Sequence, residues 1–151
     1  MIGVISDTHG LLRPEALKAL EGSSLILHAG DIGSAEILTE LRGIAPVVAV
    51  RGNTDRAPWA RNLSWTEAVE IEGRIIYLLH DLECLDLDPK AAGISVVIFG
   101  HSHSPEVETR EDVLFLNPGS AGPRRFRGPL SVGRLSFLDG EIRGEIIPLV
   151  T

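Results

Sequence analysis

Several polar side chains of the kind that bind metal ions directly follow short apolar runs of the sequence. Imidazole nitrogens combined with carboxylate and amide oxygens suit borderline divalent ions such as Mn, Fe, Co, Ni or Zn. No thiolate belongs to these segments, which disfavours a structural zinc site of the cysteine type. The pattern therefore predicts a site for divalent metal ions. Its candidate ligands are Asp7, His9, Asp31, Asn53, His80, His101 and His103.

The spacing within this set also favours a shared site. Asp7 and His9, like His101 and His103, are two residues apart, so each pair leaves an extended backbone on one side. Glycine precedes three of the other segments and permits positive φ and close backbone approach; these glycines are Gly30, Gly52 and Gly100. Each motif alone also suits a turn, a cap or a hydrogen-bonded histidine. Four of the five histidines stand at these positions, and this joint occurrence favours metal binding.

The first half of the chain has the alternation of a parallel α/β structure. Apolar runs at 2–6, 25–28 and 47–50 predict buried strands. Helices are expected over 14–20, where Pro14 suits the first turn, and over 35–43, where Gly43 ends the pattern. Such alternation implies parallel strands with helical crossovers. Their carboxyl ends meet at one edge of the sheet, where open α/β sheets place ligands.

The second half is richer in strands. Residues 66–80 predict two strands joined at Glu72-Gly73, and 96–100 predicts a buried strand. A short helix is expected over 84–92. Successive antiparallel strands are expected up to 150, with turns at 111–112 and 139–140. We expect two sheets packed face to face, with helices on the outer faces, in a single domain spanning 1–151.

Composition and charge narrow the cellular setting. A net charge of −7, without a basic tract, disfavours long nucleic acid as a partner. The single Cys84 excludes an intramolecular disulfide and is consistent with a reducing compartment. No signal-peptide pattern and no apolar run of ~20 residues occurs. We expect a cytoplasmic protein outside the membrane, and leave a homo-oligomer open.

The order of the motifs resembles that of a known family. Asp-x-His, Gly-Asp, Gly-Asn-x-Asp, His and Gly-His-x-His follow one another as in the calcineurin-like metallophosphoesterases. His-Ala-Gly-Asp (28–31), Gly-Asn-Thr-Asp (52–55) and Asn-Pro-Gly-Ser (117–120) resemble their small bacterial and archaeal phosphodiesterase branch. The resemblance covers about residues 5–122. It implies a four-layer α/β/β/α sandwich of two mixed sheets with outer helices.

The same resemblance implies a binuclear centre that hydrolyses phosphoesters. Two divalent ions per chain are expected, manganese first, with Ni, Co, Fe or Zn as alternatives. Asp7, His9 and His103 would hold one ion, Asn53, His80 and His101 the other, and Asp31 would bridge them. A hydroxide shared by the metals would attack the phosphorus of a small phosphodiester or phosphomonoester. Catalytic roles are expected for Asp31, Asn53 and His101, and substrate binding for Asn53, Thr54 and Arg124.

Two positions depart from the family pattern. Thr54 stands where many members carry histidine, and a threonine hydroxyl is a very poor proton donor. This predicts weak general-acid assistance, and hence a preference for acidic leaving groups such as aryl phosphodiesters. Asp81 follows His80 where relatives often have glycine. Its carboxylate either perturbs the local backbone or adds charge beside the site.

Other functions and other roles compete with this interpretation. Some relatives in eukaryotic trafficking complexes have altered ligand sets and act as protein-binding scaffolds; here every ligand position is filled, which favours catalysis. A nuclease acting on long nucleic acid is disfavoured, whereas small cyclic or dinucleotide phosphodiesters stay open. Three features have both a functional and an ordinary structural explanation: His28 (orienting Asp31 or packing in the core), the arginines 124, 125 and 127 (binding phosphate or facing solvent), and the pair Trp59 and Trp65 (an apolar wall or core packing).

Overall fold

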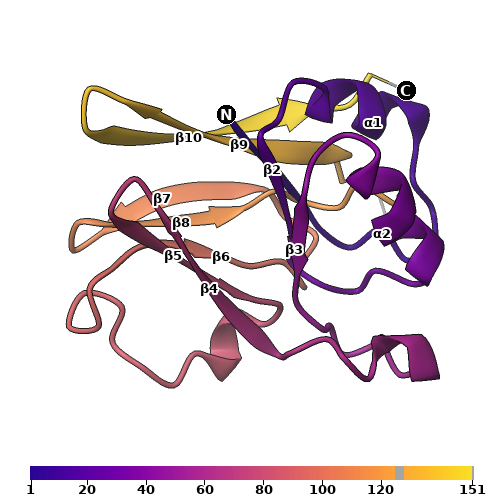
Figure 1. Cartoon of the computed structure of the whole chain (residues 1–151), viewed down its shortest axis with the longest axis horizontal. Helices are drawn as coiled ribbons and strands as arrows, with labels where there is room; N and C mark the ends of the chain where they lie inside the picture. The colour runs from indigo at the N-terminus through magenta and orange to yellow at the C-terminus, as the bar shows by residue number, and fades with distance from the viewer. Residues whose placement is uncertain (125–127, 151) are drawn as a thin grey trace.

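The computed structural model of the chain describes residues 1–124 and 128–150, and its framework is two mixed five-stranded sheets (Figure 1). The first sheet has the order β10-β9-β1-β2-β3. The strands β1, β2 and β3 are parallel, as the alternation in the sequence predicts, and β9 joins β1 antiparallel. The strand bounds are β1 (Ile2–Ile5), β2 (Leu25–His28), β3 (Val47–Ala49), β9 (Ser131–Leu138) and β10 (Glu141–Pro148).

The second sheet has the order β4-β5-β6-β8-β7. The strands β5, β6 and β8 run parallel in its middle, and β4 and β7 flank them as antiparallel hairpin partners. The hairpin predicted at Glu72-Gly73 is present, with Glu72 at φ 51° and Gly73 at φ 76°. The strand bounds are β4 (Thr66–Ile71), β5 (Arg74–Leu79), β6 (Ile94–Ile98), β7 (Glu106–Arg110) and β8 (Val113–Asn117).

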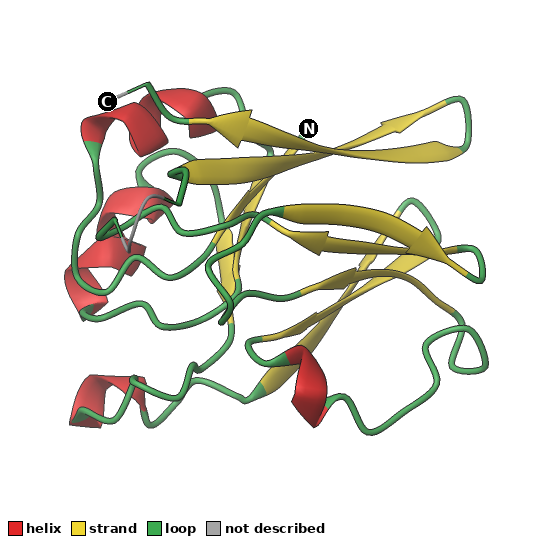
Figure 2. Ribbon diagram, turned by 180° about the vertical axis from the view of Figure 1, so that it is seen from behind, coloured by secondary structure: helices red, strands yellow, loops and turns green. Residues whose placement is uncertain are grey.

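Two helices cover the outer face of the first sheet (Figure 2). They are α1 (Pro14–Leu20) and α2 (Ala35–Arg42), both close to their predicted positions. Each turns one apolar side inward, so that Leu20 of α1 and Leu41 of α2 are fully buried in a cluster with Ile5 and Ile26. A short 3₁₀ helix, η1 (Pro58–Ala60), lies beyond β3. No helix within residues 1–124 and 128–150 is long and apolar enough to span a membrane.

The outer face of the second sheet has a thinner cover. A 3₁₀ helix, η2 (Leu82–Cys84), and the chain that follows it lie there, and the helix expected over 84–92 is absent from this segment. The reason is local: Leu85 and Leu87 alternate with polar residues, so an extended chain places both on the sheet. The Asp88 side chain accepts a hydrogen bond from the Lys90 N–H, which favours a turn. The predicted sandwich of two mixed sheets with outer helices is confirmed, with η2 and a loop as its fourth layer.

The expected run of antiparallel strands at the C-terminal end needs correction. β8 pairs parallel with β6, whereas β9 and β10 form a hairpin that belongs to the first sheet. The chain leaves the second sheet after Asn117 and enters the first at Ser131. Turn signals specify partners across a tight turn, but they do not specify which sheet a hairpin joins.

Residues of both sheets meet in a central core. Val4 and Leu27 of the first sheet pack with Leu78, Ile98 and Leu116 of the second. All five are fully buried. This core fixes how the two sheets face each other, and therefore how the loops at the ends of β1, β2, β3, β5 and β6 approach one another.

Candidate metal centre

Loops from both sheets converge at the carboxyl ends of the parallel strands. The Asp7 N–H donates to the Gly30 carbonyl at 3.0 Å and the His9 N–H to the Asp31 carbonyl at 2.9 Å, which joins the loops after β1 and β2. In the second sheet, the Gly100 N–H donates to the His80 carbonyl at 3.0 Å. The predicted convergence of separate segments on one edge is therefore present in the structure.

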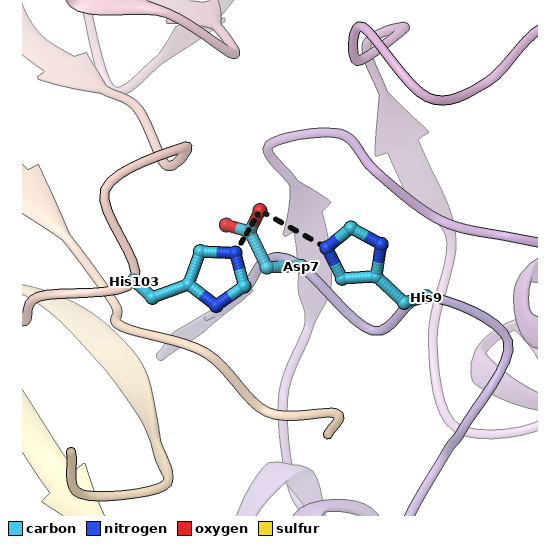
Figure 3. Close-up of side chains that lie close together, drawn as sticks. All are labelled: Asp7, His9 and His103. Carbon is cyan, nitrogen blue, oxygen red and sulfur yellow. Dashed lines mark ion pairs between the residues drawn. The ribbon is translucent and has the colours of Figure 1, made fainter. Parts of the chain in front are cut away.

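One cluster at this edge consists of Asp7, His9 and His103 (Figure 3). The Nε2 atoms of His103 and His9 lie 3.3 Å and 3.7 Å from Asp7 Oδ1. The two imidazole rings are stacked, with centroids 5.4 Å apart. One potential ligand atom from each residue lies within 4.8 Å of the other two, a spacing suited to a single ion.

A second cluster shares Asp7 with the first and adds Asp31 and His80. His80 Nε2 lies 3.1 Å from Asp31 Oδ2 and 3.9 Å from Asp7 Oδ1. The same Asp31 Oδ2 lies 3.6 Å from His9 Nε2. The Asp31 carboxylate thus stands between a histidine of each cluster, where a bridging ligand would be needed.

His101 and Asn53 complete the edge on the side of His80. His101 Nδ1 lies 3.3 Å from His80 Nε2, and the two rings meet edge to face. The His101 side chain is 47% exposed. Asn53 is also exposed and lines, with His80, the pocket beside the centre. All seven predicted ligands therefore lie at one edge of the sandwich, although Asn53 and His101 stand at its rim.

The polar atoms of this edge match what a cation requires. Among the described residues, four buried side-chain nitrogen or oxygen atoms make no hydrogen bond, and three are Asp7 Oδ1, His9 Nε2 and His103 Nδ1. Buried polar atoms in proteins are nearly always paired, so such a concentration demands an explanation. Nitrogen and carboxylate donors facing one another suit a borderline divalent ion. The residues present therefore fit the metal that the motifs predict.

Backbone strain is concentrated at the same residues. Positive φ angles occur at Asp7 (56°), His9 (46°), Asp31 (55°), His101 (72°) and His103 (64°). Residues other than glycine rarely adopt this region, and those that do gather at functional sites. In the described part of the chain, the other non-glycine residues with positive φ all belong to the three hairpin turns at 72–73, 111–112 and 139–140, each of which was predicted. Outside turns, this strain is confined to candidate ligands.

The electrostatics keep both carboxylates ionised. Burial alone would raise the pKa of Asp7, but the neighbouring imidazoles of His103, His9 and His80 and the Ser6 hydroxyl hold it well below its usual range. Burial would also raise the pKa of Asp31, but His80 and the Thr54 N–H lower it to about 2. The same negative field raises the pKa of His80 against its burial. Two buried anionic side chains side by side strongly favour a bound cation.

Two neighbours orient the Asp7 carboxylate. The Ser6 hydroxyl donates to Asp7 Oδ2 at 2.7 Å, and the His101 N–H donates to the same oxygen at 3.1 Å. Oδ1 is left facing the imidazoles. His80 is oriented similarly: its Nδ1 lies 2.8 Å from the Ala29 carbonyl, so Nδ1 carries the proton and Nε2 offers its lone pair. Sequence reasoning missed Ser6, although a polar residue closing an apolar run was a signal.

Asp55 holds two ligand-bearing loops together. It is buried, and its carboxylate accepts from the N–H groups of Ile32 (3.0 Å and 3.2 Å), Gly33 (3.1 Å) and Gly52 (2.9 Å). The first two follow Asp31, and Gly52 precedes Asn53. The sequence placed Asp55 in the Gly-Asn-Thr-Asp motif without assigning it this role.

Asn117, at the end of β8, supports the loop that carries His101 and His103. Its Nδ2 donates to the Gly100 carbonyl at 3.1 Å and to Ser102 Oγ at 3.0 Å, and its Oδ1 accepts from the Gly119 N–H. The Asn-Pro-Gly-Ser motif therefore acts on the Gly-His-Ser-His motif, a relation that spacing along the chain does not reveal.

Two glycines permit the loops to pack this closely. A Cβ atom at position 52 would collide with the main chain and carboxylate of Asp31, and one at position 100 with Ser6 and the carboxylate of Asp7. Neither Gly52 nor Gly100 has a positive φ, so close approach, rather than backbone freedom, requires them. The positive φ predicted for this group is present at Gly30, at 102°.

The residues expected to bind substrate have different surroundings. The Thr54 N–H donates to Asp31 Oδ1 at 3.0 Å, so its backbone contacts a candidate ligand. Arg124 is exposed on the loop after residues 117–120, and Arg125 and Arg127 lie outside the described residues. Substrate binding by Asn53, Thr54 and Arg124 stays a prediction.

His28 fits the structural explanation. It is fully buried, its Nδ1 accepts from the Gly30 N–H at 3.1 Å, and its Nε2 lies 3.0 Å from the Thr8 hydroxyl. Burial lowers its pKa to about 4, so the ring is neutral at pH 7. His28 is thus a hydrogen-bonded core histidine that fixes the backbone just before Asp31.

Asp81 has contacts that fit both of its expected effects, on the local backbone and on the charge beside the site. Its Oδ1 accepts from the Glu83 N–H at the start of η2, and its Oδ2 lies 3.9 Å from His101 Nε2. The carboxylate therefore shapes the local backbone and also adds negative charge beside His101.

Comparison with known proteins agrees with this site. Residues 1–140 match the calcineurin-like phosphoesterase superfamily domain. The chain is 39% identical to a probable metallophosphoesterase of Methanocaldococcus jannaschii, over 99% of this chain and 81% of that protein. A phosphodiesterase of the same organism is 30% identical, over 78% of this chain and 82% of its own length. The chain therefore belongs to the calcineurin-like phosphoesterase superfamily.

Solved structures show the same fold. An archaeal phosphodiesterase superposes with a TM-score of 0.79 at 27% identity, covering 97% of this chain and 99% of its own. Vps29 from Entamoeba histolytica, crystallised with zinc, gives a TM-score of 0.75 at 24% identity, covering 97% and 98%. Within the family, the named relatives point to a metal-binding hydrolase of the phosphodiesterase kind.

Proposed function

We propose that this chain is a phosphodiesterase that uses two divalent metal ions held by the seven residues at the edge of the sandwich. The observation that carries the proposal is the pair of buried, unpaired atoms Asp7 Oδ1 and His9 Nε2, which lie beside His103 Nε2 and a second carboxylate. Membership of the superfamily supports phosphoester hydrolysis. The phosphodiesterase of Methanocaldococcus jannaschii supports diesters as substrates.

The residues divide between two ions as the family resemblance implies. Asp7, His9 and His103 would hold one ion and Asn53, His80 and His101 the other. Asp31 bridges them, an assignment supported by its distances to His9 and His80. When bound, two neighbouring divalent ions lower the pKa of a shared water and neutralise charge on the phosphoryl oxygens. We expect manganese first, with Ni, Co, Fe or Zn as alternatives.

The side chains of this centre orient and hold rather than attack. Ser6 and the His101 N–H keep Asp7 Oδ1 directed inward, and Asp55 fixes the loops of Asp31 and Asn53 relative to each other. Asn53 and His101, at the exposed rim, stand where the phosphoryl group of a substrate would meet the centre. Thr54 offers no imidazole proton to a departing alkoxide, so substrates with acidic leaving groups are favoured.

A panel of metals and substrates tests this function. Chelated protein is reloaded with Mn, Ni, Co, Fe or Zn, and the bound ions are counted by calorimetry. Hydrolysis of bis(p-nitrophenyl) phosphate and p-nitrophenyl phosphate is then measured for the wild type, for Asp31→Asn and for the exposed-carboxylate control Glu141→Gln. We expect two ions per chain, faster hydrolysis of the diester, and loss of at least ~100-fold in rate with Asp31→Asn only.

The competing function is a protein-binding scaffold on the same fold. The likeness to Vps29 concerns the fold alone, and the complete ligand set argues for catalysis. Rates that stay at background with every metal, in protein that binds its ions, would favour the scaffold instead.

A further inference from the structure

A pocket of about 380 Å³ adjoins the candidate metal centre. Asn53 and His80, two of the candidate ligands, line it together with Arg51, Trp65, Tyr77 and Leu79. Sites for small molecules are concave, largely apolar, and usually about 300–1,000 Å³ in volume. The pocket is therefore large enough for one ring system, and it shares Asn53 and His80 with the candidate metal centre.

Trp65 is the unusual member of the lining. Its side chain is 57% exposed, whereas Trp59 packs against the core of the first sheet. Core packing, the ordinary explanation for both, thus applies to Trp59 and fails for Trp65. Because Trp65 lines a pocket together with Tyr77 and Leu79, its exposed ring offers an apolar contact to a ligand there.

Arg51 holds this wall in place. Its guanidinium carbon lies 4.7 Å from the centroid of the Trp65 ring, a cation–π contact. Its Nε donates to the Asp55 carbonyl at 2.8 Å, and its N–H donates to the Ser64 carbonyl at 2.8 Å. The wall is therefore tied, through Asp55, to the loops that carry Asp31 and Asn53. A substrate group resting against it would be positioned relative to the metals.

Acidic side chains occupy another part of the lining. Asp81 and Asp86 both border the pocket, and Asp81 also lies near His101. Their negative charge disfavours a second phosphate or a carboxylate in the pocket. An uncharged flat ring meets no such repulsion and can stack on the aromatic wall.

We propose that this pocket binds one organic arm of the phosphodiester, and that this arm carries an uncharged planar ring stacked against the Arg51–Trp65 wall. The proposal rests on the proposed function, because the phosphoryl group must sit at the metals for an arm to reach the pocket. Both an aryl group and a nucleobase have the required chemistry. The test below separates them.

The experiment uses manganese-loaded protein and two matched pairs of ligands. Phenylphosphonate and methylphosphonate share a metal-binding head and differ in the ring, as do adenosine 5′-monophosphate and ribose 5-phosphate. Affinities are measured by calorimetry. A second readout uses Cys84, the single cysteine, which is exposed and lines the same pocket: its alkylation by N-ethylmaleimide is timed with and without each ligand.

We expect a ring-bearing ligand to bind about 5- to 100-fold more tightly than its ringless partner, as base stacking on an aromatic side chain does. It should also slow the alkylation of Cys84. Trp65→Ala should remove the preference, and Trp65→Phe should keep most of it. Leu138→Ala is the matched control, since Leu138 is also apolar, is 59% exposed and lies outside the pocket; it should change nothing. A preference in only the phenyl pair assigns an aryl arm, and in only the adenosine pair a nucleoside arm.

Failure of the inference differs from failure of the function. Equal affinities within both pairs, with ions bound and diesters hydrolysed, overturn the ring pocket and leave the phosphodiesterase standing. Protein that binds neither manganese nor any of the four ligands overturns both. A preference that survives in Trp65→Ala also overturns the proposal, because the ring would then bind elsewhere.

Discussion

The two sides of the candidate metal centre differ in exposure and support. On one side, Asp7 is fully buried and held by Ser6 and a backbone N–H, and His9 and His103 are only slightly exposed. On the other, His101 is nearly half exposed and Asn53 lies at the open rim. The contrast leads us to propose that the buried residues hold metal, whereas Asn53 and His101 meet the substrate. We call them the buried side (Asp7, His9, His103) and the open side (Asn53, His101).

The largest effect should follow from changing Asp7. Asp7 is the carboxylate that both clusters share. Asp7→Asn replaces its negative charge with a neutral amide. We expect loss of both ions and at least a ~100-fold fall in diesterase rate. His101→Ala, on the open side, should leave one ion bound. Calorimetric counting of manganese measures both variants.

An Asp7→Asn protein that still binds two ions would break the comparison, since the buried side would then not govern metal binding. Circular dichroism provides the folding control. Glu141→Gln, an exposed carboxylate on β10, should retain both ions and full rate.

Asp55 should matter most for stability, because it joins the loop of Asp31 to the loop of Asn53. Asp55→Ala leaves three buried or half-buried backbone N–H groups without their acceptor. Each such loss is worth about 1–3 kcal/mol, so we expect unfolding to become easier by about 3 kcal/mol or more. Urea denaturation of the metal-free protein measures this. Asp86→Ala, which removes an exposed carboxylate, should change the unfolding free energy by less than ~0.5 kcal/mol.

If Asp55→Ala and Asp86→Ala unfold at the same urea concentration, the loops are held by other contacts. The role assigned to Asp55 in fixing Arg51 and Asn53 would then be wrong as well.

A smaller effect is expected from Asn117, which supports the histidine loop from behind. Asn117→Ala removes the donor to the Gly100 carbonyl and Ser102 Oγ. Loss of such supporting contacts usually weakens metal affinity or activity by about 10–100-fold. Because the loop carries one histidine of each side, both ions should bind more weakly, which competition with a chelating dye would detect. A fall in affinity for a single ion would instead sharpen the division between the sides.

Sequence reasoning located the candidate ligands better than the residues that support them. Asp7, His9, His80, His101 and His103 follow apolar runs, and the parallel order of β1, β2, β3, β5 and β6 brings these positions to one edge. That inference needs only the period of the strands and the direction of the chain. The contacts made by Ser6, Asp55 and Asn117 depend on which loops touch, and Asn117 lies 17 residues from Gly100. Tertiary packing alone decides such pairings.

The same limit explains the errors in the fold. In place of the helix expected over 84–92, the 3₁₀ helix η2 ends at Cys84 and turns occupy 89–93. Leu85 and Leu87 between them pack on the second sheet, a demand that the local sequence does not show. The β9–β10 hairpin was predicted, but the sheet that it joins was not. It pairs with the edge of β1 that β2 leaves free, and this edge is known only from the order of strands in the folded sheet. Trp65 is a further case. A tryptophan is expected in the core by its residue type, and only the fold shows that Trp65 is exposed at a pocket.

The smallest effect is expected from changing Thr54, which tests whether a proton donor on the open side speeds the departure of the leaving group. Thr54 is exposed beside Asn53, and its N–H already contacts Asp31, so its side chain can be changed while this backbone contact is kept. Thr54→His introduces an imidazole that can protonate a leaving alkoxide. General-acid assistance contributes up to ~10²–10⁴-fold where geometry is ideal, and an unoptimised histidine should give about 10-fold at most. The gain should appear for methyl p-nitrobenzyl phosphate and be absent for bis(p-nitrophenyl) phosphate, whose leaving group needs no proton. Thr54→Asn, which adds no proton donor of suitable pKa, is the control. Equal gains with Asn and His, or no gain on the alkyl ester, would mean that proton donation does not limit the rate at this centre.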